Sequence, residues 1–407
     1  MISTAPAAPS TGIAGQTTST RVVSVDIFRG IIMALMIFVN DLASVRGLSK
    51  WTYHMPAKVD AMTYVDMVFP AFLFIVGMSL PLAVRQRLRR NPSLGGLWLH
   101  VALRSAALLA LGLILANVDH CDQERVHLSP EAWGLLGLSG AILFWNVYTG
   151  LSRRVVWVLR FAGAALLVFM FAVFRRTVPG AEAWINFSYP EILGLIGLTY
   201  FAVCLLYIPT RRWSVAPLAW LVVLVAYNSV CCAHWIQIDH VSLYLWPFGN
   251  GAMASLVMAG IVMSQIFLDE ERTGPARKMQ LGLLMAILAF VAAWFLRPLG
   301  ISKIRATPTW ALWTVAACCL LFTILYWLCD LKKQTAWAWL VRPAGSNTLL
   351  TYLIPDLYYF LVALTGAAWL QEHWHHGWAG VFRAVVFTVA MLLVARMASS
   401  ARLRLQL

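Results

Sequence analysis

Twelve apolar runs of roughly twenty residues recur along this chain of 407 residues and limit what it can fold into. A helix needs about 20 apolar residues to cross the hydrocarbon core of a bilayer. In lipid the backbone polar groups must be satisfied internally, so such runs cross as helices and not as open strands. The runs lie at 25–44, 64–84, 97–118, 131–150, 155–174, 189–208, 213–236, 248–268, 279–297, 309–329, 345–366 and 378–398. We therefore expect an all-α polytopic membrane protein with about twelve transmembrane helices.

The composition supports a membrane protein over every soluble class. Hydrophobic residues make up 61% of the chain and charged residues only 12%, whereas an ordinary soluble domain has about 25% charged residues. These values exclude a soluble multidomain enzyme, a coiled coil and a disordered chain. The net charge of +14 does not indicate a nucleic-acid partner, because cytoplasmic ends of membrane helices carry an excess of Lys and Arg.

The distribution of Lys and Arg among the loops predicts the orientation of the chain. If both termini are cytoplasmic, the inner segments hold 17 of these residues and the outer segments hold 9. An excess on the inner side is what the positive-inside rule requires. Residues 1–20 contain no charge and lack the basic start and apolar centre of a signal peptide. We expect them to form a disordered cytoplasmic tail, followed by a single transmembrane domain at 21–400.

Two segments resemble each other at a spacing of 60 residues. Pro130-Glu131 is followed by Gly134 and Gly137, and the same pattern recurs from Pro190 to Gly197. The echo is compatible with a duplicated two-helix unit. It is equally compatible with convergence on a good helix start, since Pro and Glu suit the first turn and glycines near one another favour close helix packing.

Three polar residues gather near the predicted outer surface. Asn40 ends the first span, Asp66 begins the second, and His54 lies on the loop between them. Strongly polar residues in membrane spans are candidates for function because burying them is costly. Histidine exchanges protons near neutral pH, an amide can stabilise an oxyanion, and a carboxylate can orient the imidazole. We predict that these three residues are catalytic, the alternative being that His54 is an ordinary surface histidine.

A second candidate group lies at the predicted inner surface. Asp26 and Arg29 open the first span, and Arg85 begins a run of arginines after the second. Because the guanidinium fork matches phosphate oxygens, this end of the domain is a candidate site for an anionic cofactor. The alternative is that these arginines only set the orientation of the chain.

No residue pattern predicts a metal site. The seven cysteines show no zinc or iron–sulfur spacing, and all but Cys121 fall in apolar runs. His373, His375 and His376 share an outer loop without a matching set of carboxylate or cysteine ligands. The nucleophile-elbow, zinc-protease and phosphate-loop motifs are also missing from the sequence.

The same polar residues belong to motifs that resemble a known family. The segments that carry the resemblance are Ser24-Val25-Asp26-Ile27-Phe28-Arg29-Gly30, Phe38-Val39-Asn40 and Asp66-Met67-Val68-Phe69-Pro70. They are similar to the heparan-alpha-glucosaminide N-acetyltransferase family, in particular to bacterial members associated with N-acetylglucosamine utilisation. Weaker matches are Trp246-Pro247-Phe248, Ile301-Ser302-Lys303, Trp310 and the stretch from Gly345 through Asn347 and Tyr352 to Asp356.

The resemblance implies a transmembrane acetyltransferase. Such proteins take an acetyl group from cytosolic acetyl-CoA and pass it to a glucosamine-type amine on the far side of the membrane. It implies that His54 is the catalytic histidine, assisted by Asn40 and Asp66. The residues expected to bind acetyl-CoA are Asp26, Arg29, Arg85 and Asn347. It also implies a homodimer embedded in the lipid bilayer of a bacterial inner membrane, with a sugar acceptor as partner and no nucleic acid.

Departures from the family pattern keep other functions open. The segment Phe248-Gly249-Asn250-Gly251 lacks acidic residues that the family usually carries there, and one helix pair within 131–236 is additional. One alternative is a twelve-helix secondary transporter for amino sugars or muropeptides. Against it, little charge lies at mid-depth beyond Arg104 and Asn228. The other alternative is a scaffold that has lost activity.

Overall fold

The computed structural model describes residues 22–178, 183–236, 249–268, 273–367 and 373–407. Within these ranges every regular element is helical, apart from four isolated β-bridges. The expected tail at 1–20 and the motif at 246–248 lie outside the described residues. The predicted all-helical, polytopic fold class is confirmed.

Each of the twelve apolar runs coincides with a helix. These helices are α1 (Val23–Leu42), α2 (Val65–Arg90), α3 (Leu94–Asn117), α5 (Pro130–Trp145), α6 (Arg153–Val173), α7 (Glu191–Thr210), α8 (Ala216–Cys232), α9 (Ala252–Leu268), α10 (Pro275–Phe295), α11 (Pro308–Leu325), α13 (Thr348–Thr365) and α15 (Gly377–Ser400). Short pieces join them: α4 (Gln123–Val126), α12 (Val341–Ser346), a π-helical stretch at Tyr326–Leu331 and 3₁₀ turns at Lys50–Thr52, Val118–His120, Arg297–Leu299 and Ala336–Trp339.

Nine helices among the described residues are long and apolar enough to cross a membrane. The three that fall short are α8 and α9, with 17 residues each, and α5, with 16. The number of actual crossings and the side on which each terminus lies remain predictions.

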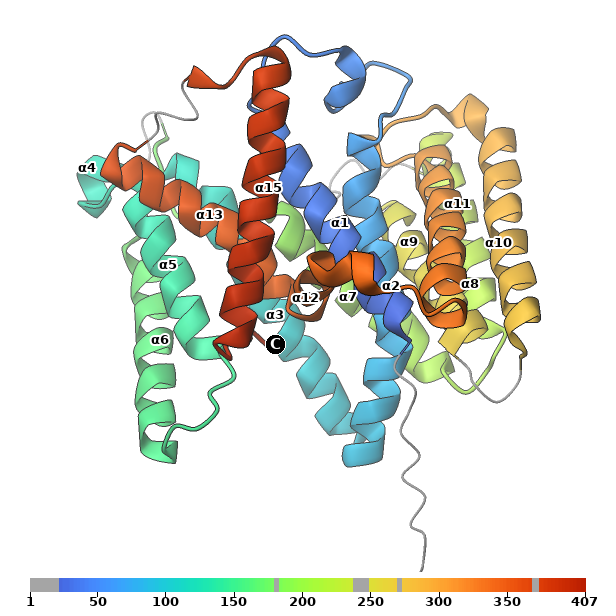
Figure 1. Cartoon of the computed structure of the whole chain (residues 1–407), viewed down its shortest axis with the longest axis horizontal. Coiled ribbons are helices and arrows are strands. Elements are labelled where there is room, and N and C mark those ends of the chain that lie inside the picture. The colour runs from blue at the N-terminus through green and yellow to red at the C-terminus, as the bar shows by residue number, and fades with distance from the viewer. Residues whose placement is uncertain (1–21, 179–182, 237–248, 269–272, 368–372) are drawn as a thin grey trace, which may run out of the picture.

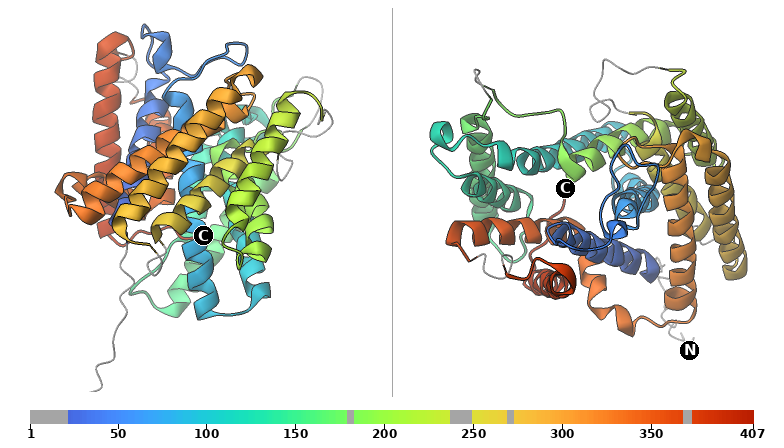
Figure 2. Two further views of the ribbon diagram at one scale, coloured as in Figure 1. Left: turned by 90° about the vertical axis from the view of Figure 1, so that its right-hand side faces the viewer. Right: turned by 90° about the horizontal axis from the view of Figure 1, so that it is seen from above.

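The helices pack around a central group formed by α1, α2, α3 and α7 (Figure 1). On one side, α2 runs along α9, which lies among α8, α10 and α11; on the other, α5 pairs with α6 (Figures 1 and 2). Helix α13 slants between these two sides and packs against α1, α5 and α15. The loops that carry His54 and Lys303 therefore lie near the same end of the bundle, above α2 and α11.

Glycines permit the closest helix contacts. A Cβ atom added at Gly77 in α2 would overlap the carbonyl oxygen of Val257 in α9, and one at Gly260 in α9 would overlap that of Phe74 in α2. Small residues at such crossings let two backbones approach closely in a membrane. These reciprocal backbone contacts hold α2 and α9 in register, and a side chain larger than that of glycine would not fit at either position.

The two echoing segments place glycines against the same helix. A Cβ at Gly137 in α5 would meet Ile114, and one at Gly197 in α7 would meet Leu108, both on α3. The helix pairs that follow are packed differently, because α5 lies along α6 whereas α7 lies mainly along α3. Packing against α3 accounts for Gly137 and Gly197 without requiring a duplicated helix pair, whereas Gly134 faces Phe360 of α13.

Replacing Gly77 with valine should destabilise the bundle. The added side chain must push α2 away from α9, and overpacking of this kind costs about 1–3 kcal/mol or more. Thermal unfolding of the purified protein in detergent should show a lower midpoint for Gly77→Val. The control is Gly274→Ala, since no atom lies within 4 Å of the added Cβ there. Equal midpoints for Gly77→Val and wild type would contradict the close contact.

Candidate active site

His54 and Asp66 form a direct pair at the N-terminal end of α2. The His54 Nδ1 and Asp66 Oδ1 atoms are 2.7 Å apart, and the carboxylate side chain is only 1% exposed while the imidazole is 47% exposed. Because a carboxylate only accepts hydrogen bonds, Nδ1 carries the proton and Nε2 keeps its lone pair. The buried acid thus orients an imidazole whose other nitrogen can take a proton from a bound molecule.

The Asp66 carboxylate is fixed by further donors. Its second oxygen accepts hydrogen bonds from the backbone N–H of Thr63 at 3.0 Å and of Met55 at 3.3 Å, and from the Thr63 hydroxyl at 3.3 Å. The indole N–H of Trp310 donates to the Asp66 carbonyl at 3.0 Å. A carboxylate in the first turn of a helix is also favoured by the helix dipole. Asp66 therefore connects the loop that precedes α2 to the start of α2 through its carboxylate, and α2 to α11 through its backbone carbonyl.

Lys303 completes the group from a segment distant in sequence. Its Nζ lies 3.3 Å from Nε2 and 3.4 Å from Nδ1 of His54. Burial lowers the pKa of the Lys303 amine, and the nearby charge of Asp66 only partly opposes that shift. Sequence reasoning did not single out this lysine. Its only signal was the weak Ile301-Ser302-Lys303 match, because no residue spacing connects positions 54 and 303.

The loop that carries Lys303 is held from two sides. Asp60 accepts from the backbone N–H of Ile301 and pairs with Arg305 at 3.5 Å. From below, the amide groups of Asn228 and Asn250 both donate to the carbonyl of Ala306, at 3.0 and 2.8 Å. Asn228, notable in the sequence as a polar residue at mid-depth, is thus an anchor for this loop.

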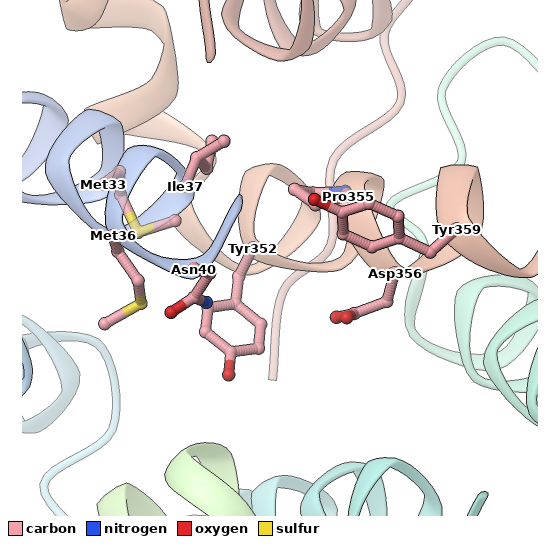
Figure 3. Close-up of a pocket in the computed structure, with 8 residues that line it drawn as sticks. All are labelled: Met33, Met36, Ile37, Asn40, Tyr352, Pro355, Asp356 and Tyr359. Atoms are coloured by element: carbon pink, nitrogen blue, oxygen red, sulfur yellow. The ribbon is translucent and has the colours of Figure 1, made fainter. Parts of the chain in front are cut away.

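Asn40 does not contact His54 or Asp66. It lines a cavity of about 50 Å³ with Met33, Met36 and Ile37 of α1 and with Tyr352, Pro355, Asp356 and Tyr359 of α13 (Figure 3). The structure therefore joins two of the three predicted catalytic residues directly and places the third in a neighbouring pocket. The catalytic roles themselves remain predictions.

Arg29 joins three elements near the other end of α1. Its guanidinium donates to the carbonyl of Gly345 at 2.9 Å and to the hydroxyl of Ser79 at 2.7 Å, and lies 3.4 Å from Asp26. These contacts connect α1 to α2 and to α12. Arg85 lies on an exposed part of α2. Arg85 is therefore accessible to a phosphate group, whereas Arg29 could bind one only by giving up its hydrogen bonds to Gly345 and Ser79.

Asn347 holds the end of the chain. Its amide donates to the carbonyl of Leu403 at 2.8 Å and to the Ser399 hydroxyl at 3.3 Å, and its oxygen accepts from the N–H of Leu405 at 3.4 Å. Its predicted role in binding acetyl-CoA would require this segment to rearrange. Among the residues described, no group of three or more His, Cys, Asp or Glu side chains could hold a metal ion.

Residues 21–121 match the family model for the catalytic region of heparan-alpha-glucosaminide N-acetyltransferase. The resemblance is thereby confirmed for this part of the chain. The human protein of that name is 36% identical over 122 residues, which are 30% of this chain and 17% of the human protein. The mouse protein is 32% identical over 127 residues, which are 31% of this chain and 18% of the mouse protein. The chain thus spans less than a fifth of these curated relatives.

The lowered pKa of Lys303 predicts unusual reactivity. A lower pKa means that the amine loses its proton at a lower pH, so Lys303 should react with an acylating reagent at a lower pH than an ordinary exposed lysine, for which Lys50 serves as the comparison. Mass spectrometry of labelled peptides over a pH series gives the midpoint for each lysine. In Asp66→Asn the Lys303 midpoint should fall further, because the charge that raises it is removed. Coincident midpoints for Lys303 and Lys50 would contradict the burial of the amine.

Proposed function

We propose that this protein is a transmembrane acetyltransferase that moves an acetyl group from cytosolic acetyl-CoA to the amine of a glucosamine-type sugar on the periplasmic side of a bacterial inner membrane. The observation that carries the proposal is the His54–Asp66 pair, which lies in the part of the chain that matches the catalytic model. Both curated relatives are named as N-acetyltransferases of a glucosaminide. We extend the proposal to a homodimer in which residues 21–400 act as one domain.

In the proposed reaction, His54 acts as the general base. The free amine of the acceptor attacks the thioester carbon, Nε2 of His54 takes the proton that the amine loses, and the C–S bond breaks to release CoA. Asp66 stabilises the imidazolium that forms, as the acid of a catalytic triad does. Lys303 Nζ lies 3.3 Å from Nε2 and 3.4 Å from Nδ1, so it stands beside the face of the imidazole and does not occupy the in-plane lone pair of Nε2.

A second route uses His54 as the nucleophile. Nε2 attacks the thioester carbon, CoA leaves, and the acetyl-imidazole then passes its acetyl group to the amine. In either route, we propose that the Asn40 amide donates to the oxyanion and that Arg85, Arg29, Asp26 and Asn347 bind the cytosolic end of acetyl-CoA. The exposed Arg87, Arg89 and Arg90 beside Arg85 supply further positive charge for phosphates.

His54→Ala should lower acetyl transfer by at least roughly a hundredfold, since a positioned base typically contributes that much or more. Turnover of acetyl-CoA with glucosamine, measured in detergent or proteoliposomes, checks this. The matched control is His127→Asn, because His127 is exposed and has a left-handed backbone conformation that asparagine tolerates. Near-normal transfer by a folded His54→Ala protein would overturn the assignment.

A single-turnover experiment separates the two routes. Without acceptor, the nucleophilic route predicts release of CoA in an amount matching the enzyme, and direct transfer predicts no such burst. His54→Ala should abolish any burst that occurs.

The competing function is a secondary transporter. A polar pocket that includes Asp356 within the helix bundle is a feature that transporters also need. Proteoliposomes containing the protein distinguish the two functions. The enzyme forms acetylated sugar only when acetyl-CoA is supplied, whereas a transporter accumulates unmodified sugar without acetyl-CoA. Accumulation without any acetylated product would overturn the proposed function.

A further inference from the structure

The pocket beside Asn40 joins two helices that are far apart in sequence. Asn40 belongs to α1, while Tyr352 and Asp356 lie one turn apart on α13. Figure 3 shows the Asn40 amide, the Tyr352 phenol and the Asp356 carboxylate pointing to the same side of these helices. Methionine, isoleucine and proline side chains and the Tyr359 ring form the rest of the lining. The pocket therefore presents a few convergent polar groups on an apolar wall, as small-molecule sites commonly do.

Two polar groups of this pocket, the Asn40 amide and the Asp356 carboxylate, are available to bind a ligand. Neither the Asn40 amide nor the Asp356 carboxylate has a hydrogen-bond or ion-pair partner in the part of the chain that the structure describes. Tyr352 is different, because its hydroxyl donates to Oε1 of Glu191 at 2.9 Å. Glu191 thus brings a second carboxylate close to the pocket, where it accepts from this hydroxyl and from the backbone N–H of Leu193 at 3.1 Å.

A neighbouring carboxylate, in contrast, has both an ion-pair partner and a hydrogen-bond donor. Asp41, next to Asn40 in sequence, is paired with Arg383 at 3.2 Å and accepts from the Tyr359 hydroxyl at 2.8 Å. Asp356 has neither kind of partner among the described residues. An ionised carboxylate without a partner is costly inside a membrane domain, and a cation that also donates hydrogen bonds would offset that cost when it binds.

The size of the cavity limits the cation. A volume of about 50 Å³ accommodates only a few water molecules, since each needs roughly 10–15 Å³ of such space. A primary ammonium group fits this volume, whereas a whole sugar ring does not. A primary ammonium has three donors, so it can pair with Asp356 and still donate to another polar group of the lining.

We propose that this pocket binds the primary ammonium group of the amino-sugar acceptor, with Asp356 as its ion-pair partner and Asn40 and Tyr352 as its hydrogen-bond acceptors. Glu191 adds negative charge through Tyr352. The proposal rests on the proposed acetyltransferase function and names the residues that select an amine over a hydroxyl. Because the carboxylate favours the charged amine, this is a capture site; the amine reacts only after it has lost its proton.

The direct test is ligand-dependent thermal stabilisation without acetyl-CoA. Wild type should be stabilised by glucosamine hydrochloride and not by glucose, nor by sodium chloride at equal ionic strength. Asp356→Asn should bind glucosamine about tenfold more weakly or worse, in line with the loss of a charged hydrogen bond. The control Glu124→Gln, the same change on the exposed α4, should bind as wild type does. Equal stabilisation by glucose or by sodium chloride would overturn the proposal.

Kinetics separate this proposal from the proposed function. Asp356→Asn should raise the KM for glucosamine with little change in the KM for acetyl-CoA, and Tyr352→Phe should do so more mildly if Asp356→Asn fails to fold. His54→Ala should still bind glucosamine. Acetyl transfer with an unchanged acceptor KM in folded Asp356→Asn would overturn the capture site and leave the function intact. Amine binding that requires Asp356, without any acetyl transfer, would instead overturn the function.

Discussion

Polar groups inside a bilayer must find their partners within the protein, and this constraint accounts for most of the contacts described above. Water cannot satisfy a buried carboxylate or guanidinium there, so those that are paired connect the elements that supply their partners. Arg383 and Asp41 tie α15 to α1, and Arg29 ties α1 to α2 and α12. The bundle is thus held by glycine contacts between backbones and by a small number of internal polar links.

Asp66 is another of these links. It receives hydrogen bonds from the loop that precedes α2 and from Trp310 of α11, and it also orients His54. One carboxylate therefore determines both the shape of the loop between α1 and α2 and the direction of the imidazole. The same residue also faces Lys303, whose loop is held by Asp60 and by two buried asparagines. Of the candidate site residues, Asp66 lies at a helix end, whereas His54 and Lys303 belong to loops that hydrogen bonds hold in place.

Most of what could be predicted came from the length of the apolar runs and from the small number of polar residues within them. Twelve apolar runs became twelve helices, since a run long enough to cross lipid has no other stable backbone conformation there. His54 and Asp66 were recognisable because polar residues are rare in so apolar a chain, and they meet because only a short loop separates them. Lys303 and Asp356 were not recognised as site residues, because their significance depends on neighbours that lie hundreds of residues away in the sequence.

The sequence by itself determined the fold class, the approximate helix boundaries and the pairing of a histidine with an acid at one end of the second helix. Local chemistry suffices for these features, since hydropathy and short-range spacing encode them. Only the tertiary structure decided that Asn40 faces α13 and not His54, that Arg29 and Asn347 serve internal contacts, and that Lys303 lies against the imidazole. These features depend on which helices pack together and how each is rotated about its axis, and that is set by close contacts, such as those at Gly77 and Gly260, which hydropathy does not encode.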